Sequence, residues 1–196
     1  MLTSDLLSPL KKRTSSGMGR QEEEPMSSQS PHNVEVRAEL DHPDAQQLLV
    51  GQALARLAYT GPDGFPRVIP IGFHWNGGQI IVCTVPISPK VRALSARPHV
   101  ALTIDTDDGT ASRALQVRGV ATIEIVDGVP DEYLAAATKT MDDQQARQFE
   151  ANVRMLYQQM ARISIEPRWA RYYDFGAGRI PGFLRKLAED RAAIHG

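Results

Sequence analysis

The middle of the chain consists of short runs that alternate between apolar and polar residues and are separated by turn residues. This period of two predicts strands, over 53–59, 68–75, 79–85, 99–105 and 115–126. Gly61-Pro62-Asp63-Gly64 and Asn76-Gly77-Gly78 have the residue chemistry of tight reversals. A further short strand is predicted over 162–166, ending at Pro167. Because few helices separate these runs, the pattern favours an antiparallel sheet over alternating strands and helices.

Helices are predicted at both ends of this strand-rich block. Asp41 is the expected N-cap of a short helix that has Pro43 in its first turn. The composition of 131–139 also favours a helix, and a longer one is predicted over 142–160. Its apolar residues recur every three or four positions, namely Ala146, Phe149, Val153, Leu156 and Met160. These five side chains are expected to contact the core or a subunit interface.

Composition divides the 196 residues into one folded domain and two tails. Residues 1–33 are rich in Ser, Gln, Glu and Lys, so they are expected to be disordered. Residues 41–175 hold the predicted strands and form the expected domain, and 176–196 are expected to be an irregular C-terminal tail. Within the domain, Pro70 removes a ladder donor from its strand, which predicts a sheet edge or a bulge.

The charge balance narrows the classes of partner. Lys and Arg total 22 and Asp and Glu total 23, and a near-neutral chain of this kind argues against a general nucleic-acid binder. No run of about 18 apolar residues is present to cross a bilayer, and no secretory signal is evident at the start. With Cys83 as the single cysteine, no disulfide can form within the chain. We therefore expect a cytoplasmic protein with neither nucleic-acid nor membrane partners.

The segment Ser88-Pro89-Lys90 carries the clearest candidate chemistry. Serine followed by proline is a favourable helix start, in which the serine hydroxyl is expected to cap the helix and proline occupies the first turn. A helix N-terminus offers free N–H groups to an anion, and Lys90 and Arg92 add positive charge. A phosphate would suit this position. From the spacing alone, a capped surface helix whose basic residues are simply solvated is the simpler interpretation.

Other candidate groups fit structural roles better. Cys83 lies in an apolar strand and is expected to be a core thiol. His74 could line a cavity, but a structural role is the simpler interpretation. The histidines lack metal-ligand spacing, and no nucleophile elbow, paired-cysteine zinc motif or phosphate loop is present.

The order of these motifs resembles the flavin-binding split β-barrels of the pyridoxamine 5'-phosphate oxidase-like superfamily. The resemblance runs from about 57 to 125 and, more loosely, from 154 to 175. Its features are a Pro-Gly turn, Val68-Ile69-Pro70, a Gly-Gly hairpin, a strand ending in Thr84, the Lys90 helix start and Val117-Arg118-Gly119. The implied fold is mainly β (α+β), an antiparallel split β-barrel with peripheral helices.

The resemblance also implies positions for a cofactor. A flavin ring would lie along the second strand, against Val68, Ile69 and Pro70, largely through their backbone. Thr84 would lie near the ring or ribityl chain, Ser88 and Lys90 would hold the phosphate, and Gln116 would reach the cofactor from the fifth strand. Because such sites usually lie between two subunits, a homodimer is implied, with Trp169 or Arg168 supplied by the partner.

Three functions are compatible with the resemblance. The first is an FMN-dependent oxidoreductase that acts on a small conjugated substrate. The second is a reductase that uses the deazaflavin coenzyme F-420; its relatives often carry a second basic residue near the position of Ser88, where this chain has none, although Arg92 could substitute. The third is a non-catalytic carrier of a flavin or a tetrapyrrole. The extended basic motif of the true pyridoxamine phosphate oxidases is not matched, so that reaction is not predicted.

Overall fold

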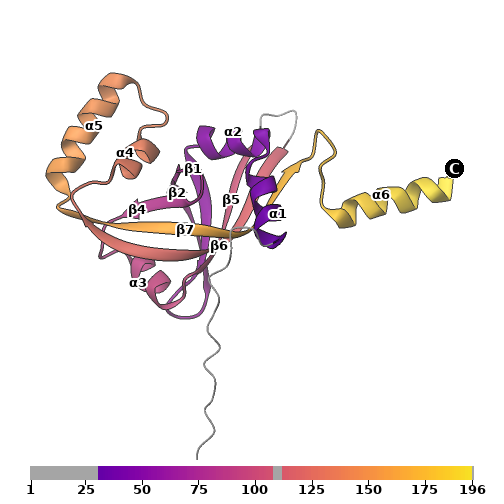
Figure 1. The fold of residues 1–196 in the computed structure, drawn as a ribbon, viewed down its shortest axis with the longest axis horizontal. Coiled ribbons are helices and arrows are strands. Elements are labelled where there is room, and N and C mark those ends of the chain that lie inside the picture. The colour runs from indigo at the N-terminus through magenta and orange to yellow at the C-terminus, as the bar shows by residue number, and fades with distance from the viewer. Residues whose placement is uncertain (1–30, 108–111, 196) are drawn as a thin grey trace, which may run out of the picture.

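The alternating runs of the sequence come together in one curled antiparallel sheet. The structure, a computed structural model, describes residues 31–107 and 112–195 (Figure 1). In these residues the strands are β1 Leu54–Thr60, β2 Pro66–Gly72, β3 His74–Trp75, β4 Ile80–Thr84, β5 His99–Asp107, β6 Ser112–Asp127 and β7 Gln159–Asp174. Their order is β2-β1-β5-β6-β7-β4-β3, and every neighbouring pair is antiparallel. The expected mainly β split barrel is confirmed.

One face of the curled sheet encloses the hydrophobic core. Successive side chains of a strand point to opposite faces, and on β6 Leu115 and Val117 are buried whereas Gln116 and Arg118 are exposed. The largest fully buried side chains come from several strands, from three helices and from Phe73 between β2 and β3, and include Tyr172, Leu57, Ile80, Leu102, Leu115, Leu40, Leu48 and Leu94. The opposite face of β2, β1, β5, β6 and the second half of β7 is called the outer face below.

The predicted second strand is divided into two. The expected strand over 68–75 is interrupted at Phe73, whose side chain is completely buried. The chain turns into the core there, so β2 lies at one edge of the sheet and β3 at the other. Pro70 therefore lies on an edge strand, as its missing N–H predicted.

The last strand does not end at Pro167, contrary to the sequence prediction. It continues to Asp174, because a register shift accommodates the proline. Arg118 pairs with Trp169 and Gly119 pairs with Pro167, which leaves Arg168 as the extra residue of a β-bulge. A bulge disrupts the ladder locally, so the missing proline N–H costs little there.

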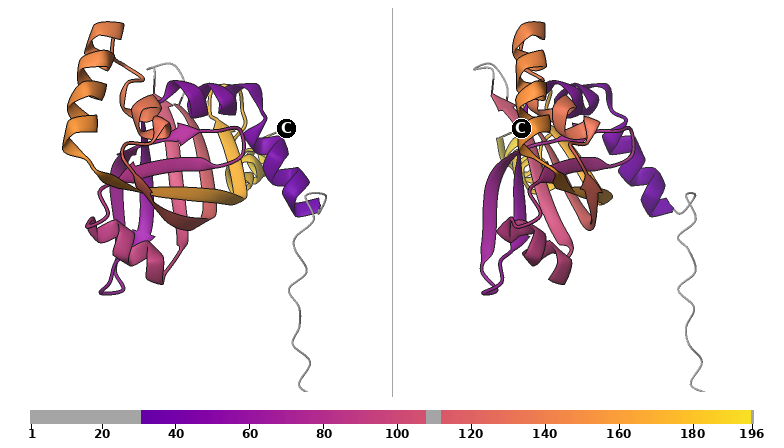
Figure 2. Two further views of the ribbon diagram at one scale, coloured as in Figure 1. Left: turned by 60° about the vertical axis from the view of Figure 1, so that its left-hand side comes forward. Right: turned by 90° about the vertical axis from the view of Figure 1, so that its left-hand side faces the viewer.

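Helices close the two ends of the barrel. Their bounds are α1 Pro31–Leu40, α2 Pro43–Gly51, α3 Pro89–Ala96, α4 Asp131–Ala137, α5 Asp143–Leu156 and α6 Gly182–His195. Helix α2 crosses one end of the sheet and α3 lies at the other (Figure 2). The N-cap of α2 is His42 rather than the predicted Asp41, since the His42 Nδ1 accepts a hydrogen bond from the Asp44 N–H at 3.3 Å.

Helix α1 was not predicted, and it starts inside the expected tail. Most of that tail, residues 1–30, lies outside the described residues, so the expected disorder stays a prediction. Glu39 anchors α1 to β7: its carboxylate accepts hydrogen bonds from Arg171 at 2.9 Å, from Arg179 at 2.6 Å and from the Tyr172 N–H at 2.8 Å. The second half of β7, which has moved away from β4, is thereby covered on its free edge.

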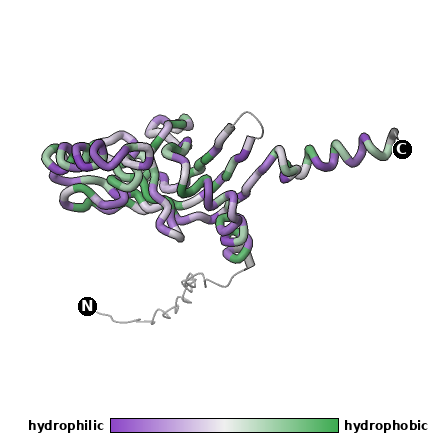
Figure 3. Tube along the Cα trace, turned by 90° about the horizontal axis from the view of Figure 1, so that it is seen from above, coloured by the Kyte–Doolittle hydropathy of each residue, from purple (hydrophilic) through white to green (hydrophobic). Residues whose placement is uncertain are grey.

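The last two helices also differ from the sequence prediction. Helix α5 ends at Leu156, whose side chain is 69% exposed, and Met160 lies on β7; of the expected apolar stripe only Val153 is a buried residue of the helix. The C-terminal segment, expected to be irregular, forms α6, which extends away from the sheet (Figures 1 and 3). Over 31–107 and 112–195, no helix is both long enough and apolar enough to span a membrane.

Candidate functional site

Three of the residues predicted to bind the cofactor converge at the start of α3. The Lys90 Nζ donates hydrogen bonds to the Ser88 Oγ at 2.9 Å and to the Thr84 Oγ1 at 3.2 Å. Ser88 is the N-cap residue and Pro89 begins the helix, but the Ser88 hydroxyl makes no capping bond. The expected side-chain cap is therefore wrong: that hydroxyl contacts the lysine instead, and the Val91 N–H donates to the Ser88 backbone carbonyl at 2.9 Å.

The environment of Lys90 favours an anion. Ser88 is buried and Lys90 is half-buried, and this burial lowers the pKa of the lysine below its ordinary value. In the part of the chain that the structure describes, no carboxylate lies within ion-pair distance of its ammonium. An ammonium has three N–H donors, and two of them are used by the hydroxyls, so one is left for a ligand. Both hydroxyls can also rotate to donate.

The remaining predicted residues lie on the outer face or at its edge. Val68 and Pro70 are exposed on β2, whereas the Ile69 side chain packs against the core. Strand pairing joins Pro70, Arg56, Thr103, Gln116 and Arg171 in one row across five strands. Gln116 therefore shares a face with Pro70, three strands away. No hydrogen bond or ion pair among the described residues links this row to the Lys90 cluster.

A cleft of about 520 Å³ lies on the outer face, near the end of the sheet where the β1–β2 turn lies. Residues from β1, β2, β5, β6 and β7 line it: Ala58, Tyr59, Thr60, Pro66, His99, Val100, Ala101, Arg118, Gly119, Val120 and Arg168. The lining is mostly apolar, and its charged residues are arginines. Trp169 lies beside it, with the Arg118 guanidinium 4.4 Å from its ring centroid.

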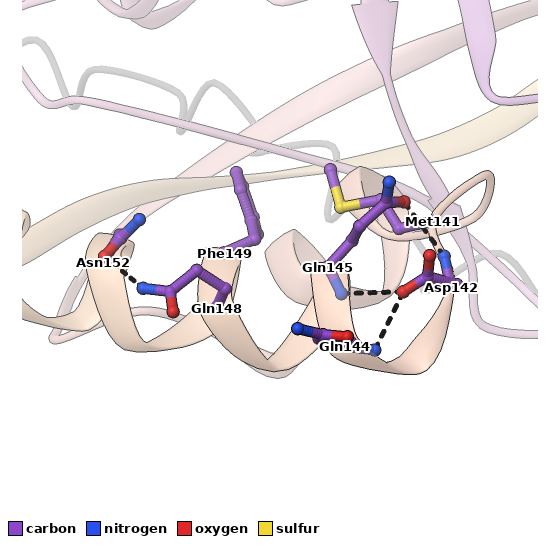
Figure 4. Close-up of a pocket in the computed structure, with 7 residues that line it drawn as sticks. All are labelled: Met141, Asp142, Gln144, Gln145, Gln148, Phe149 and Asn152. Carbon is purple, nitrogen blue, oxygen red and sulfur yellow. Dashed lines mark hydrogen bonds between the residues drawn. The ribbon is translucent and has the colours of Figure 1, made fainter.

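A second hollow, of about 760 Å³, lies on α5 (Figure 4). It is lined by Met141, Asp142, Gln144, Gln145, Gln148, Phe149 and Asn152. Its polar groups are used by the helix itself: the Asp142 carboxylate accepts from the N–H groups of Gln144 and Gln145, and the Gln148 amide donates to Asn152. None of the residues predicted for a cofactor lies here.

The two side chains given structural roles from the sequence lie near α4. Cys83 packs in an apolar cluster with Val153 and Met160, and burial raises the pKa of its thiol to about 12. His74 is half-buried on β3. Over the described residues no group of three His, Cys, Asp or Glu side chains is arranged to hold a metal ion.

Comparison with known proteins places this geometry in a family. The model of the pyridoxamine 5'-phosphate oxidase family matches residues 42–172, which include the whole sheet except its last two residues. The chain belongs to the pyridoxamine 5'-phosphate oxidase family. Helix α1 precedes the matched region and α6 follows it. No curated protein matches the sequence.

Several solved structures are similar to this family member. A conserved hypothetical protein from Mycobacterium tuberculosis is 21% identical with a TM-score of 0.53, over 74% of this chain and 92% of its own. An F-420 reductase is 23% identical with a TM-score of 0.47, over 63% and 94%. An FAD-binding protein from Mesorhizobium loti is 18% identical with a TM-score of 0.45, over 65% and 87%. At 21% identity, the likeness to the Mycobacterium tuberculosis protein concerns the fold alone.

The donor set at α3 in this pyridoxamine 5'-phosphate oxidase family member fits a phosphate group. A half-buried cation and two hydroxyls that can rotate to donate supply hydrogen-bond donors for phosphate oxygens. Sequence reasoning assigned no role to Arg118, although it lies in the motif Val117-Arg118-Gly119. The alternation along β6 would have predicted that Arg118 lies on the outer face. Its position in the cleft could not be predicted, because the cleft forms only when β6 and four other strands pair in the observed register.

Proposed function

We propose that the protein binds FMN and acts as an oxidoreductase on a small conjugated substrate. The observation that carries this proposal is the cluster of Thr84, Ser88 and Lys90 at the start of α3. A half-buried lysine without a carboxylate partner among the described residues is costly unless an anion is bound nearby. A phosphate monoester would supply that anion, and FMN carries one.

Each predicted residue has a distinct task in this proposal. Lys90 and Ser88 hold the phosphate by charge-assisted hydrogen bonds, and Thr84 orients the lysine and the adjoining chain of the cofactor. Val68, Ile69 and Pro70 border the ring along the edge strand. Gln116 supplies a polar contact from the same face as Pro70. The bound flavin supplies hydride or electron-pair transfer; the protein binds and orients the reactants and excludes water.

We also propose a cytoplasmic homodimer whose second subunit completes the site. Leu54 on β1 is 56% exposed on the outer face beside the residues assigned to the ring, and Val68, one of those residues, is 66% exposed. Exposed apolar side chains grouped on one sheet face are typical of surfaces that bind another protein. A second copy would cover them and would enclose the ring.

The absorption spectrum and ligand titrations of the purified protein test the cofactor. We expect a flavin spectrum or, for cofactor-free protein, saturable binding of FMN with weaker binding of riboflavin. Binding of F-420 or haemin without binding of FMN would contradict the proposal and would favour a deazaflavin reductase or a tetrapyrrole carrier. Reduction of bound FMN followed by reoxidation with candidate conjugated substrates separates an enzyme from a carrier.

A further inference from the structure

The outer-face cleft combines an apolar lining with charged residues of one sign, which is positive. Its floor comes from small or apolar residues such as Ala58, Pro66 and Ala101. Its charged lining residues are Arg118 and Arg168, and no Asp or Glu is among the described residues that line it. Such a surface suits a molecule that has an apolar body and a negative end.

Arg118 differs from the other arginines of this face in its ionic partners. Arg56 is paired with Asp105, Arg168 with Glu166 and Arg171 with Glu39. Over residues 31–107 and 112–195, no carboxylate lies within ion-pair distance of Arg118, whose contact is the Trp169 ring at 4.4 Å. Stacking on an aromatic ring holds the guanidinium plane while leaving its N–H donors available for a carboxylate.

The bulge fixes where Arg118 projects. At Gly119 a Cβ atom would lie 2.5 Å from the Glu166 carbonyl oxygen and 2.8 Å from the Ile165 Cγ2, so β6 and β7 approach each other unusually closely directly after Arg118. Arg118 therefore extends from a constrained backbone into the cleft, opposite Trp169. A binding group held in this way loses little freedom on binding.

We propose that the outer-face cleft binds a small aromatic carboxylate, with Arg118 as the partner of the carboxylate group. The role of this ligand as a substrate rests on the proposed flavin function; the binding itself does not. Strand pairing joins Val68, Ala58, Ala101 and Arg118 in one row. With strands about 4.8 Å apart, Arg118 lies roughly 14 Å from the edge strand assigned to the ring, so the apolar body of the ligand occupies the surface between them.

Titration calorimetry on the cofactor-free protein tests the cleft, with naphthoate as the probe and naphthamide as its neutral analogue. We expect wild type to bind naphthoate about tenfold to hundredfold more tightly, the range that a charge-assisted hydrogen bond supplies. In Arg118→Gln this preference should disappear because naphthoate affinity falls, and Arg118→Lys should restore part of it. Arg147→Ala, which removes an exposed arginine of α5, is the matched control and should behave as wild type.

Three results would overturn the inference. The first is equal affinity of wild type for the two ligands, and the second is a preference that survives in a folded Arg118→Gln protein. The third is a wild-type dimer that becomes a monomer in Arg118→Gln, as measured by light scattering, while naphthoate binding is unchanged. That result would mean that the Arg118 guanidinium contacts a second copy of the chain. Binding of FMN without naphthoate would overturn only the cleft; binding of naphthoate without FMN would overturn only the proposed flavin function.

Discussion

At the scale of single residues, Lys90 connects burial, charge and the proposed cofactor. Its ammonium is held by two hydroxyls at 2.9 and 3.2 Å. Neutral hydroxyls do not offset its charge, so the ammonium carries the free-energy cost of partial burial without an ionic partner. Binding of an anion there would relieve that cost. The same three residues could have formed a purely structural hydrogen-bonded turn, and the response to a ligand phosphate separates the two roles.

We predict that Lys90→Ala weakens FMN affinity by roughly 10- to 150-fold, because a charge-assisted contact contributes about 1.5–3 kcal/mol. The affinity for riboflavin, which has no phosphate, should decrease much less. Arg92→Ala removes an exposed charge two residues further along α3 and serves as the control, with little change expected. Fluorescence titration of all three proteins with both ligands measures the effect, and equal losses for FMN and riboflavin would refute the phosphate role.

The pH dependence of binding has a definite sign. Burial lowers the pKa of Lys90 in the free protein, and a bound phosphate favours the charged lysine. FMN affinity should therefore be greatest at pH values below that lowered pKa and should decrease as pH rises through it. Riboflavin titrated over the same range corrects for ionisation of the ring. A ratio of the FMN and riboflavin dissociation constants that stays constant into the alkaline range would show that Lys90 does not contact the phosphate.

At the scale of elements, local patterns predicted the strands because alternation and turn chemistry are local properties. The Asn76-Gly77-Gly78 hairpin has a φ of 92° at Gly77, a conformation that favours glycine. The glycine at this position was therefore enough to predict the turn. Helix α1 has no such local signal, because its attachment depends on Glu39 meeting Arg171, 132 positions away. The continuation of β7 past Pro167 likewise depends on a bulge opposite Gly119, which only the strand register reveals.

Gly119 is the element-scale test of that bulge. We predict that Gly119→Ala destabilises the fold by about 1–3 kcal/mol or more, the cost of overpacking a tight interior, since the clash is with backbone at 2.5 Å. The melting temperature should fall by several degrees. Gly51→Ala at the end of α2 is the control, because a Cβ there meets nothing within 4 Å. Equal melting temperatures for the two variants would show that β6 and β7 are not so close at the bulge.

At the scale of the whole molecule, the two edges of the sheet are consecutive in the chain. Residue Phe73 alone separates β2 from β3, so the edge strand proposed to border the cofactor is attached to the core by a fully buried ring. The Lys90 cluster lies at the start of α3, and no hydrogen bond or ion pair among the described residues joins it to the outer-face row from Pro70 to Gln116. The proposed dimer therefore rests on the exposed apolar side chains beside this edge, which a second copy would cover.

The dimer is tested by introducing a charge on the outer face. Leu54 is 56% exposed on β1 and is not assigned to the cofactor. Leu54→Glu would put a carboxylate into the proposed apolar interface, where an unpaired charge is strongly disfavoured. We predict that light scattering shows a dimer for wild type and a monomer for this variant, with FMN affinity reduced in parallel because the site loses its second half. Met155→Glu, at a 79% exposed position on α5, is the matched control and should remain dimeric with unchanged FMN affinity. A wild-type monomer that binds FMN tightly would mean that one subunit forms the whole site, and the partner's proposed role would then be wrong.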